Sequence, residues 1–303
     1  MKIILCIPVL NAEARLPALL AAIKTQTVQP DEFWVINSTS TDKSVEILRD
    51  ARVNVHIIPR SEFNHGGTRH LFLSLTQGDI YIYLTDDAIP ASPQTFESIL
   101  SVFKRDSLTG LAYGRQLPYP NATPFSAHAR LFNYPETSFS KTLSDSKKLG
   151  IKTPFCSDSF SAYRREVLEG VGGFPNHVIM AEDVYTAAKI LQKGWKVSYV
   201  AEAAVYHSHN YSVSQEFKRY FDIGVFYGKE KWIQNTFGKA GAEGKRFLYS
   251  ELNYLKRNKE HFLFPEWFFR NLMKWLGYQL GQREKWIPLF IKKRLSMCRK
   301  YWE

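Results

Sequence analysis

The sequence is poor in cysteine and has no long apolar run. Its three cysteines are odd in number and far apart (Cys6, Cys156 and Cys298), which argues against a disulfide framework or a cysteine metal site and predicts reduced thiols in a cytosolic protein. No apolar stretch reaches the length of about 18 residues that spans a bilayer. The first residues, MKIILCIPVL, continue as a strand pattern without a cleavage site, so we expect no signal peptide.

Positive charge is concentrated at the C-terminal end of the chain. The net charge is +11, and residues 239–303 contribute +9 of it, because they hold fifteen Lys or Arg against six Glu. A protein that binds nucleic acid over its whole surface seldom concentrates its charge in this way. We therefore expect no nucleic-acid partner.

Strand-like apolar runs and amphipathic segments alternate along the first part of the 303 residues. The predicted strands are residues 3–9, 33–37, 55–59 and 79–85. The predicted helices are residues 17–24, 44–51, 71–77 and 92–106, with Ser40 or Thr41 capping the second and Ser92 capping the fourth ahead of Pro93. This alternation predicts an α/β fold with a mostly parallel sheet flanked by helices.

The second part of the chain changes pattern twice. Residues 112–150 are rich in Pro, Ser and Tyr and predict a long, partly mobile loop. A strand and a helix are expected in 158–174, a helix in 181–195 and a strand in 196–207. After about residue 214 the pattern is helical, aromatic and basic, so we divide the chain into 1–213 and 214–303, the first with halves at about 1–110 and 111–213.

Two adjacent carboxylates, Asp86 and Asp87, end the predicted strand at 79–85. Ligands of open parallel sheets bind beyond the carboxyl ends of the strands. A hard carboxylate there, with open positions beside it, suits a divalent metal that serves a phosphate. The alternatives are a solvated turn or an N-cap for the next helix, although Ser92 already fills the expected capping role.

Three further positions in the first half are candidates for ligand binding. Asn37 ends the strand at 33–37, where its amide could read a base edge. The loop FNHGGTRH, residues 63–70, has two glycines that would let backbone approach a ligand closely. Arg69 in that loop could bind phosphate or ribose oxygens. Helix capping after Asn37 and ordinary loop packing are the alternatives.

Acidic and imidazole side chains in the second half provide candidates for catalysis. Asp183 opens a predicted helix, where the helix dipole should keep it ionised and able to act as a general base. Asp158 could bind sugar hydroxyls. His207 and His209 end the last predicted strand, and His207 could complete a metal shell begun by Asp87. Dipole stabilisation alone and isolated histidines are the alternative interpretations.

Aromatic and basic residues interleave in the tail, in residues 262–280 and 286–302. This pattern is typical of helices that lie in a bilayer interface. A helical packing domain whose aromatic residues form a core is the alternative, and both can hold together. We therefore expect a C-terminal helical, membrane-associating extension.

Together these segments resemble a family 2 glycosyltransferase with the GT-A fold over residues 1–213. The resemblance rests on IPVLNAE, VINSTSTDKS, LTDDAIP and AEDV with the histidines that follow it. FNHGGTR, LTDDAIP and HSHNYS resemble the rhamnosyltransferases of bacterial O-antigen and surface-polysaccharide assembly.

The resemblance implies a role for each matching residue. Nucleotide-sugar binding falls to the following residues: Pro8, Asn11, Asn37, Arg69, Asp86, Asp87 and Asp158. Mg²⁺ or Mn²⁺ would be held by Asp87 and His207, and Asp183 would be the catalytic base. The implied reaction is a single inverting displacement that moves L-rhamnose from dTDP-L-rhamnose to a glycan on a polyprenyl diphosphate.

The implied location is the inner face of the bacterial plasma membrane, where a peripheral protein with a basic tail meets anionic lipid. The family usually has Asp in place of Asn37, and the rhamnosyl subgroup often has Gln in place of Asp86. A UDP-hexose or UDP-N-acetylhexosamine donor is therefore an alternative. A non-catalytic nucleotide- or membrane-binding protein on a degenerate transferase fold is a second alternative. The sequence gives no prediction of the oligomeric state.

Overall fold

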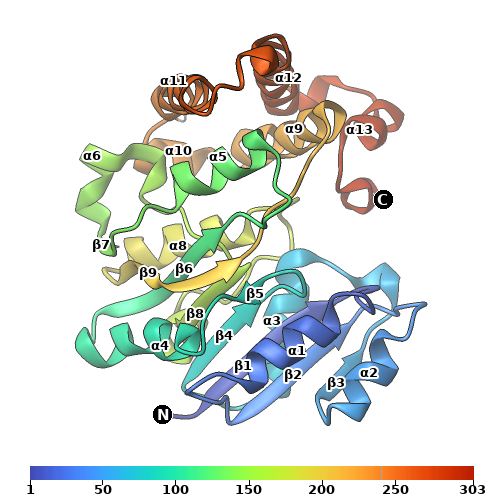
Figure 1. Cartoon of the computed structure of the whole chain (residues 1–303), viewed down its shortest axis with the longest axis vertical. Helices are drawn as coiled ribbons and strands as arrows, with labels where there is room; N and C mark the ends of the chain where they lie inside the picture. Colours follow the sequence, from blue (N-terminus) through green and yellow to red (C-terminus); the bar gives the residue numbers. More distant parts are fainter. Residues whose placement is uncertain (240) are drawn as a thin grey trace.

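The chain forms a mixed sheet with helices on both faces and a helical C-terminal region stacked at one end (Figure 1). The computed structural model describes residues 1–239 and 241–303. The strands are β1 Ile3–Val9, β2 Glu32–Asn37, β3 Asn54–Ile57, β4 Ile80–Leu84, β5 Ile89–Pro90, β6 Thr109–Leu117, β7 Phe139–Lys141, β8 Phe160–Arg164 and β9 Lys196–Tyr206. The helices before the C-terminal region are α1 Leu16–Lys24, α2 Ser44–Asp50, α3 His65–Leu75, α4 Thr95–Arg105, α5 Pro124–Asn133, α6 Ser146–Leu149, α7 Arg165–Gly170 and α8 Glu182–Gln192. The C-terminal helices are α9 Val213–Lys229, α10 Lys231–Phe237, α11 Gly241–Arg257, α12 Phe264–Gln282 and α13 Leu289–Leu295.

The strand order is β3-β2-β1-β4-β8-β6-β9-β5, and β7 pairs with β9. The first four strands along the chain run parallel to one another, as predicted. β8 runs antiparallel between β4 and β6, and β5 and β7 pair antiparallel with β9. The α/β sheet flanked by helices is confirmed, but its second half is mixed rather than parallel, because β8 begins beside the end of β4, where Phe160 pairs with Leu84.

Side chains of alternate residues on the central strands enter two separate cores. Ile3, Leu5 and Ile7 of β1 pack with α1, α2 and α4 on one face. Ile4 and Cys6 point to the other face, toward α3, α8 and α9. A strand alternates its side chains between faces, so a strand buried on both sides is a continuous apolar run. The sequence of β1 shows this pattern.

The predicted loop at 112–150 is wrong. This segment holds most of β6, then α5, β7 and α6. Thr123 caps α5 by accepting from the Ser126 N–H, and Pro124 occupies the first helical position. The sequence Thr-Pro was therefore a helix signal that the Pro-rich composition concealed.

The glycines of the predicted loop at 63–70 lie inside helix α3, which begins at His65. Asn64 caps this helix by accepting from the Gly67 N–H at 2.9 Å. A Cβ on Gly66 would lie 1.8 Å from the Pro175 carbonyl oxygen. Gly66 thus allows α3 to approach a neighbouring segment of the protein, which corrects the expectation of a ligand-binding glycine loop.

The predicted caps of two other helices are also wrong. α2 begins after Lys43 and α4 after Gln94. Ser40 instead uses its hydroxyl to accept from the Asn11 N–H at 2.8 Å. The Ser92 carbonyl accepts from the Thr95 N–H in a turn ahead of α4.

The C-terminal helices are joined to the rest of the molecule through a shared core. Phe221, Val225 and Phe226 of α9 and Trp302 near the C-terminus belong to the same apolar cluster as β4 and β8. In Figure 1, α11, α12 and α13 form the end of the molecule that lies farthest from β1 and β2. Within residues 1–239 and 241–303, no helix is both long enough and apolar enough to cross a membrane.

Candidate active site

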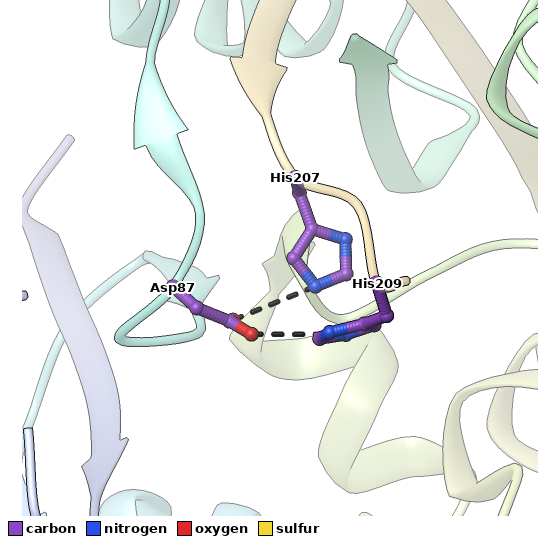
Figure 2. Close-up of side chains that lie close together, drawn as sticks. All are labelled: Asp87, His207 and His209. Carbon is purple, nitrogen blue, oxygen red and sulfur yellow. Dashed lines mark ion pairs between the residues drawn. The ribbon is translucent and has the colours of Figure 1, made fainter. Parts of the chain in front are cut away.

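The short strand β5 brings the acidic turn after β4 to the end of β9. Ile89 pairs with Tyr206, so Asp87, two residues before Ile89, lies beside the residues that follow β9. These residues are His207 and His209, and Figure 2 shows both imidazoles directed at the Asp87 carboxylate. The pairing of a two-residue strand thus assembles three side chains from segments more than a hundred residues apart.

The three side chains have the spacing of a metal site. Asp87 Oδ1 lies 3.5 Å from His207 Nε2, and Asp87 Oδ2 lies 3.7 Å from His209 Nε2. One possible ligand atom from each residue lies within 4.8 Å of the others. Two ligands of one divalent ion at about 2.1 Å lie about 3–3.5 Å apart. One carboxylate and two imidazoles therefore fit a divalent transition metal with small movements.

The protonation of this cluster suits metal binding. Burial works against ionisation of Asp87, but His207 and His209 hold the pKa of its carboxyl well below the ordinary value. Burial and the neighbouring His207 lower the pKa of His209 to about 4. Asp87 is therefore a carboxylate and His209 a neutral imidazole at neutral pH, which are the forms that bind metals.

Gln116 on β6 fixes the orientation of the His207 ring. Its Oε1 lies 2.9 Å from His207 Nδ1 and also accepts from the Arg130 guanidinium. Because this oxygen can only accept, it keeps a proton on Nδ1 and leaves Nε2 directed at Asp87, 3.5 Å away. Nε2 can donate to the Asp87 carboxylate when it carries a proton and can bind a metal when it does not.

Asp86 points away from this cluster. It pairs with Arg15 at 2.7 Å, at the start of α1. Burial raises the pKa of Asp86 above its ordinary value, against the effect of Arg15. The two adjacent acids thus differ in role, since Asp87 faces the histidines and Asp86 ties the β4 turn to α1.

Asp183 is half-buried and lies at the first turn of α8, beside the buried carboxylates of Glu182 and Asp158. Its Oδ2 accepts from the Asp158 backbone N–H at 3.3 Å. Arg69 lies between the other two acids, with Nη1 2.8 Å from Glu182 Oε1 and Nε 3.5 Å from Asp158 Oδ2. Three carboxylates therefore share one guanidinium.

Burial and the neighbouring carboxylates favour the protonated form of Asp183, because Arg69 is shared among three acids. Burial, and then the charges of Glu182 and Asp158, raise the pKa of Asp183 to about 8. Burial alone would raise the pKa of Glu182, but Arg69 brings it below the ordinary value. The expectation that the helix dipole keeps Asp183 ionised is wrong, because burial beside like charges outweighs the dipole.

Arg69 and Asp158 lie beneath the site, with little open surface. Asp158 is buried, and its Oδ1 accepts from the hydroxyls of Ser161 at 2.6 Å and Tyr163 at 2.7 Å. Arg69 is buried as well, and its guanidinium contacts the His65 carbonyl oxygen, Glu182 and Asp158. In this arrangement Arg69 and Asp158 support the carboxylates at the start of α8, and their predicted role in binding the nucleotide sugar stays a prediction.

Hydrogen bonds and one peptide bond, between Ser157 and Asp158, link the histidine cluster to Asp183. Gln116, which orients His207, donates from Nε2 to Ser157 Oγ at 2.9 Å. Ser157 precedes Asp158, whose backbone N–H binds Asp183. The histidine cluster and Asp183 are thus connected through β6 and the loop that precedes β8.

The predicted nucleotide turn is assembled around Asn11. This residue has φ 48°, in the left-handed region, and its Oδ1 accepts from the Thr41 N–H at 2.9 Å. Asn37 is fully buried and uses both ends of its amide on Ser40, at 2.8 Å each. Pro8 lies one strand away, paired with Ile36. Asn37 therefore shapes the turn rather than presenting a free amide.

Several residues of the site were not predicted from the sequence. His209 had a signal, because residues two apart on a strand share a face, and it lies beside His207. Glu182 had a weaker one, as the acid next to Asp183. Gln116 and Arg15 had none, because their partners are remote in sequence.

Comparisons with known proteins show the family of this chain. The sequence model for "Glycosyl transferase family 2" matches residues 4–172, more than half of the chain. The O-antigen chain rhamnosyltransferase RfbN of Salmonella typhimurium is 46% identical over 304 residues, covering 100% of this chain and 96% of that protein. The O-antigen chain rhamnosyltransferase WbaN of Salmonella anatum is 45% identical over 300 residues, covering 98% and 95%.

Solved structures with low sequence identity share the fold. The mannosyltransferase PcManGT of Pyrobaculum calidifontis, in complex with GDP-Man and Mn²⁺, superposes with a TM-score of 0.63 at 16% identity, covering 94% of this chain and 86% of that one. TarS of S. aureus, residues 1–349 in complex with UDP, gives 0.55 at 16% identity, covering 94% and 91%. The resemblance seen in the sequence is confirmed, and this chain is a glycosyltransferase that belongs to glycosyl transferase family 2.

Proposed function

We propose that the protein transfers L-rhamnose from dTDP-L-rhamnose to a lipid-linked glycan during O-antigen assembly. The observation that carries this is the pairing of a metal-type cluster, Asp87 with His207 and His209, with a separate half-buried acid, Asp183, in a chain 46% identical to a rhamnosyltransferase. A diphosphate leaving group and an acceptor hydroxyl need these two kinds of group on opposite sides of the reacting carbon.

Mn²⁺ fits the cluster better than Mg²⁺ does. Two of the three candidate donors are imidazole nitrogens, which Mg²⁺ seldom accepts. Two solved structures that share the fold are complexes with Mn²⁺. A divalent ion on Asp87, His207 and His209 would neutralise the diphosphate and make it a better leaving group.

Asp183 is proposed to accept the proton of the acceptor hydroxyl. The oxygen forms its bond to the anomeric carbon as the bond to dTDP breaks, and dTDP leaves with the electron pair from the opposite face. The configuration inverts, and no covalent enzyme intermediate forms. The raised pKa of Asp183 makes its ionised form a stronger base than an exposed aspartate.

The donor would occupy the edge of the sheet at the ends of β1, β2 and β4. We propose that Pro8 and Asn11 border the nucleotide, while Asn37 shapes the adjoining turn. Asp86 holds the β4 turn through Arg15. Residues 1–213 would then form the catalytic part, with the donor half at about 1–110 and the acceptor half at about 111–213.

We place the acceptor on a polyprenyl diphosphate at the cytoplasmic face of the plasma membrane. Support comes from the basic, aromatic tail, because anionic lipid attracts Lys and Arg. Residues 214–303 would form the region that associates with the membrane.

Thermal unfolding with a panel of nucleotide sugars tests the donor. A ligand that binds only the folded state raises the melting temperature. We expect stabilisation by dTDP-L-rhamnose with Mn²⁺ that exceeds stabilisation by UDP-hexoses or UDP-N-acetylhexosamines. Equal responses would favour the alternative donors. Binding without transfer to any glycan, in the wild type as in Asp183→Asn, would favour a non-catalytic protein.

A further inference from the structure

Helix α12 differs from an ordinary surface helix, because its large apolar residues face outward and its charged residues face the protein. Phe268 and Trp275 are 63% and 58% exposed, and Leu272 between them is also exposed. Arg270 and Lys274, on the opposite face, are each only 7% exposed. Residues three or four apart share a helix face. The aromatic face of α12 therefore points outward and its charged face inward.

Glycines allow the inward face to pack tightly on α9. A Cβ on Gly281 would lie 2.0 Å from the Phe221 carbonyl oxygen, and one on Gly277 would lie 2.4 Å from the Phe217 carbonyl oxygen. A Cβ on Gly224 of α9 would lie 2.3 Å from the Tyr278 carbonyl oxygen. Glycines four residues apart that bring helix backbones together are typical of helices in lipid, where apolar side chains need not face inward.

The inward charges are neutralised within the protein. Arg270 pairs with Glu216 of α9 at 3.0 Å and with Glu266 at 2.7 Å. Lys274 lies 3.4 Å from Glu216 and 3.8 Å from Glu251 of α11. Buried ion pairs at this contact hold α12 in one orientation, since turning the helix would leave these charges unpaired.

The residues that follow α12 extend its apolar surface. Trp286, Leu289 and Phe290 are exposed. Arg294 and Arg299, in the same C-terminal segment, are exposed and make no ion pair among the residues that the structure describes. Exposed aromatic side chains next to unpaired cations are complementary to a surface that has an anionic outer layer over an apolar interior.

We propose that the outward face of α12, with the segment 286–290, is a docking surface for an anionic lipid bilayer. It deepens the proposed function by assigning the membrane contact to one face of one helix and the turn after it. Trp and Phe prefer the interface between head groups and acyl chains, and the arginines add attraction to anionic lipid. With its outward face on the bilayer, α12 would lie parallel to the plane of the membrane.

Arg270 connects the docking surface to the active site. Its Nη1 donates to the Tyr211 carbonyl oxygen at 2.9 Å. The Tyr211 ring packs on the His209 ring with centroids 5.1 Å apart. The same guanidinium that fixes the orientation of α12 thus also holds the segment that carries two candidate metal ligands. A membrane bound by α12 would lie at a fixed position relative to the site, as an acceptor anchored in that membrane requires.

Co-sedimentation with vesicles tests the proposal without donor or acceptor. Full-length protein is mixed with phosphatidylcholine vesicles that contain or lack phosphatidylglycerol. We expect binding to the anionic vesicles, and a loss of about tenfold or more when paired outward aromatics are removed, in Phe268→Ser/Trp275→Ser and in Trp286→Ser/Phe290→Ser. The matched control, Ile57→Ser/Leu108→Ser, removes exposed apolar residues from the far part of the molecule and should bind as the wild type does. Arg294→Glu/Arg299→Glu should reduce binding to anionic vesicles, and added salt should do the same.

Wild-type binding by both aromatic variants, with unchanged circular dichroism, would overturn the proposal. It would also be overturned if no protein bound vesicles while the aromatic substitutions converted a dimer to a monomer in light scattering, because the face would then cover a second copy. Transfer to a water-soluble glycan acceptor should be unchanged in the aromatic variants. Failure of vesicle binding and failure of the proposed reaction are therefore distinguishable.

Discussion

Replacing Asp183 by Asn should stabilise the protein, and the gain should grow as the pH rises. Burial beside Glu182 and Asp158 raises the pKa of Asp183 from 3.8 to about 8. A raised carboxyl pKa contributes stability that is fully present below the unfolded value and is lost as the pH rises through the folded value. Between about pH 4 and pH 8 ionisation of this carboxyl lowers the free energy of the unfolded wild type. The folded wild type keeps the proton and is not stabilised in this way.

The size of this effect follows from proton linkage. One proton released on unfolding changes the free energy of unfolding by at most about 1.4 kcal/mol per pH unit. The substitution keeps the shape of the side chain, and the amide oxygen that it introduces can still accept from the Asp158 N–H. The advantage of Asp183→Asn should start near zero at about pH 4, rise across the window and level off above about pH 8.

Urea denaturation at a series of pH values measures the difference. Asp106→Asn is the matched control of opposite sign, because hydrogen bonding to Lys196 lowers the pKa of Asp106. Its stabilising effect is present above the unfolded pKa, so Asp106→Asn should be less stable than the wild type by a constant amount from about pH 5 to pH 8. A pH-independent difference for Asp183→Asn over the same range would refute the reasoning about the carboxylate group.

The other predictions concern the metal cluster, its support and the packing of α3. Gln116→Leu should weaken Mn²⁺ binding by about 10- to 100-fold in calorimetric titrations, while Gln116→Glu, which still accepts from the His207 Nδ1–H, should lose less; equal losses would contradict the orienting role. His209→Ala should raise the Mn²⁺ concentration needed to restore transfer after chelation, and transfer that survives chelation unchanged would contradict a metal site. Gly66→Ala should cost about 1–3 kcal/mol or more in the free energy of unfolding. Gly67→Ala should stay within about 1 kcal/mol of the wild type, because its Cβ would have no neighbour closer than 3.5 Å; similar losses in both would contradict the close approach to Pro175.

The first half of the fold was predictable because each strand there is an apolar run that ends in a polar turn. β1, β2 and β4 were placed to within one or two residues, since strands buried on both faces have no alternation to misread. The second half depends on contacts remote in sequence. β5 has only two residues, and its pairing with β9 cannot be read from its own composition.

The residues of the candidate site also differ in how far the sequence alone could predict them. Asp87 and His207 end strands, and that position marked both as candidates. Asp158 and Arg69 were predicted to bind the nucleotide sugar, and their burial and mutual pairing could not be read from the sequence. A polar residue can face a ligand, or it can support another residue that faces the ligand. Packing between several elements decides which of these holds, and a single sequence does not show that packing.

The most direct test of the proposed reaction is the anomeric configuration of its product. Wild-type protein with Mn²⁺, dTDP-L-rhamnose and a lipid-linked glycan acceptor should give a rhamnoside whose configuration is opposite to that of the donor, as read by NMR. Asp183→Asn should bind the donor and lose about 100- to 10,000-fold in transfer rate. A product with retained configuration, or a variant that transfers at the wild-type rate, would contradict single displacement with Asp183 as the base.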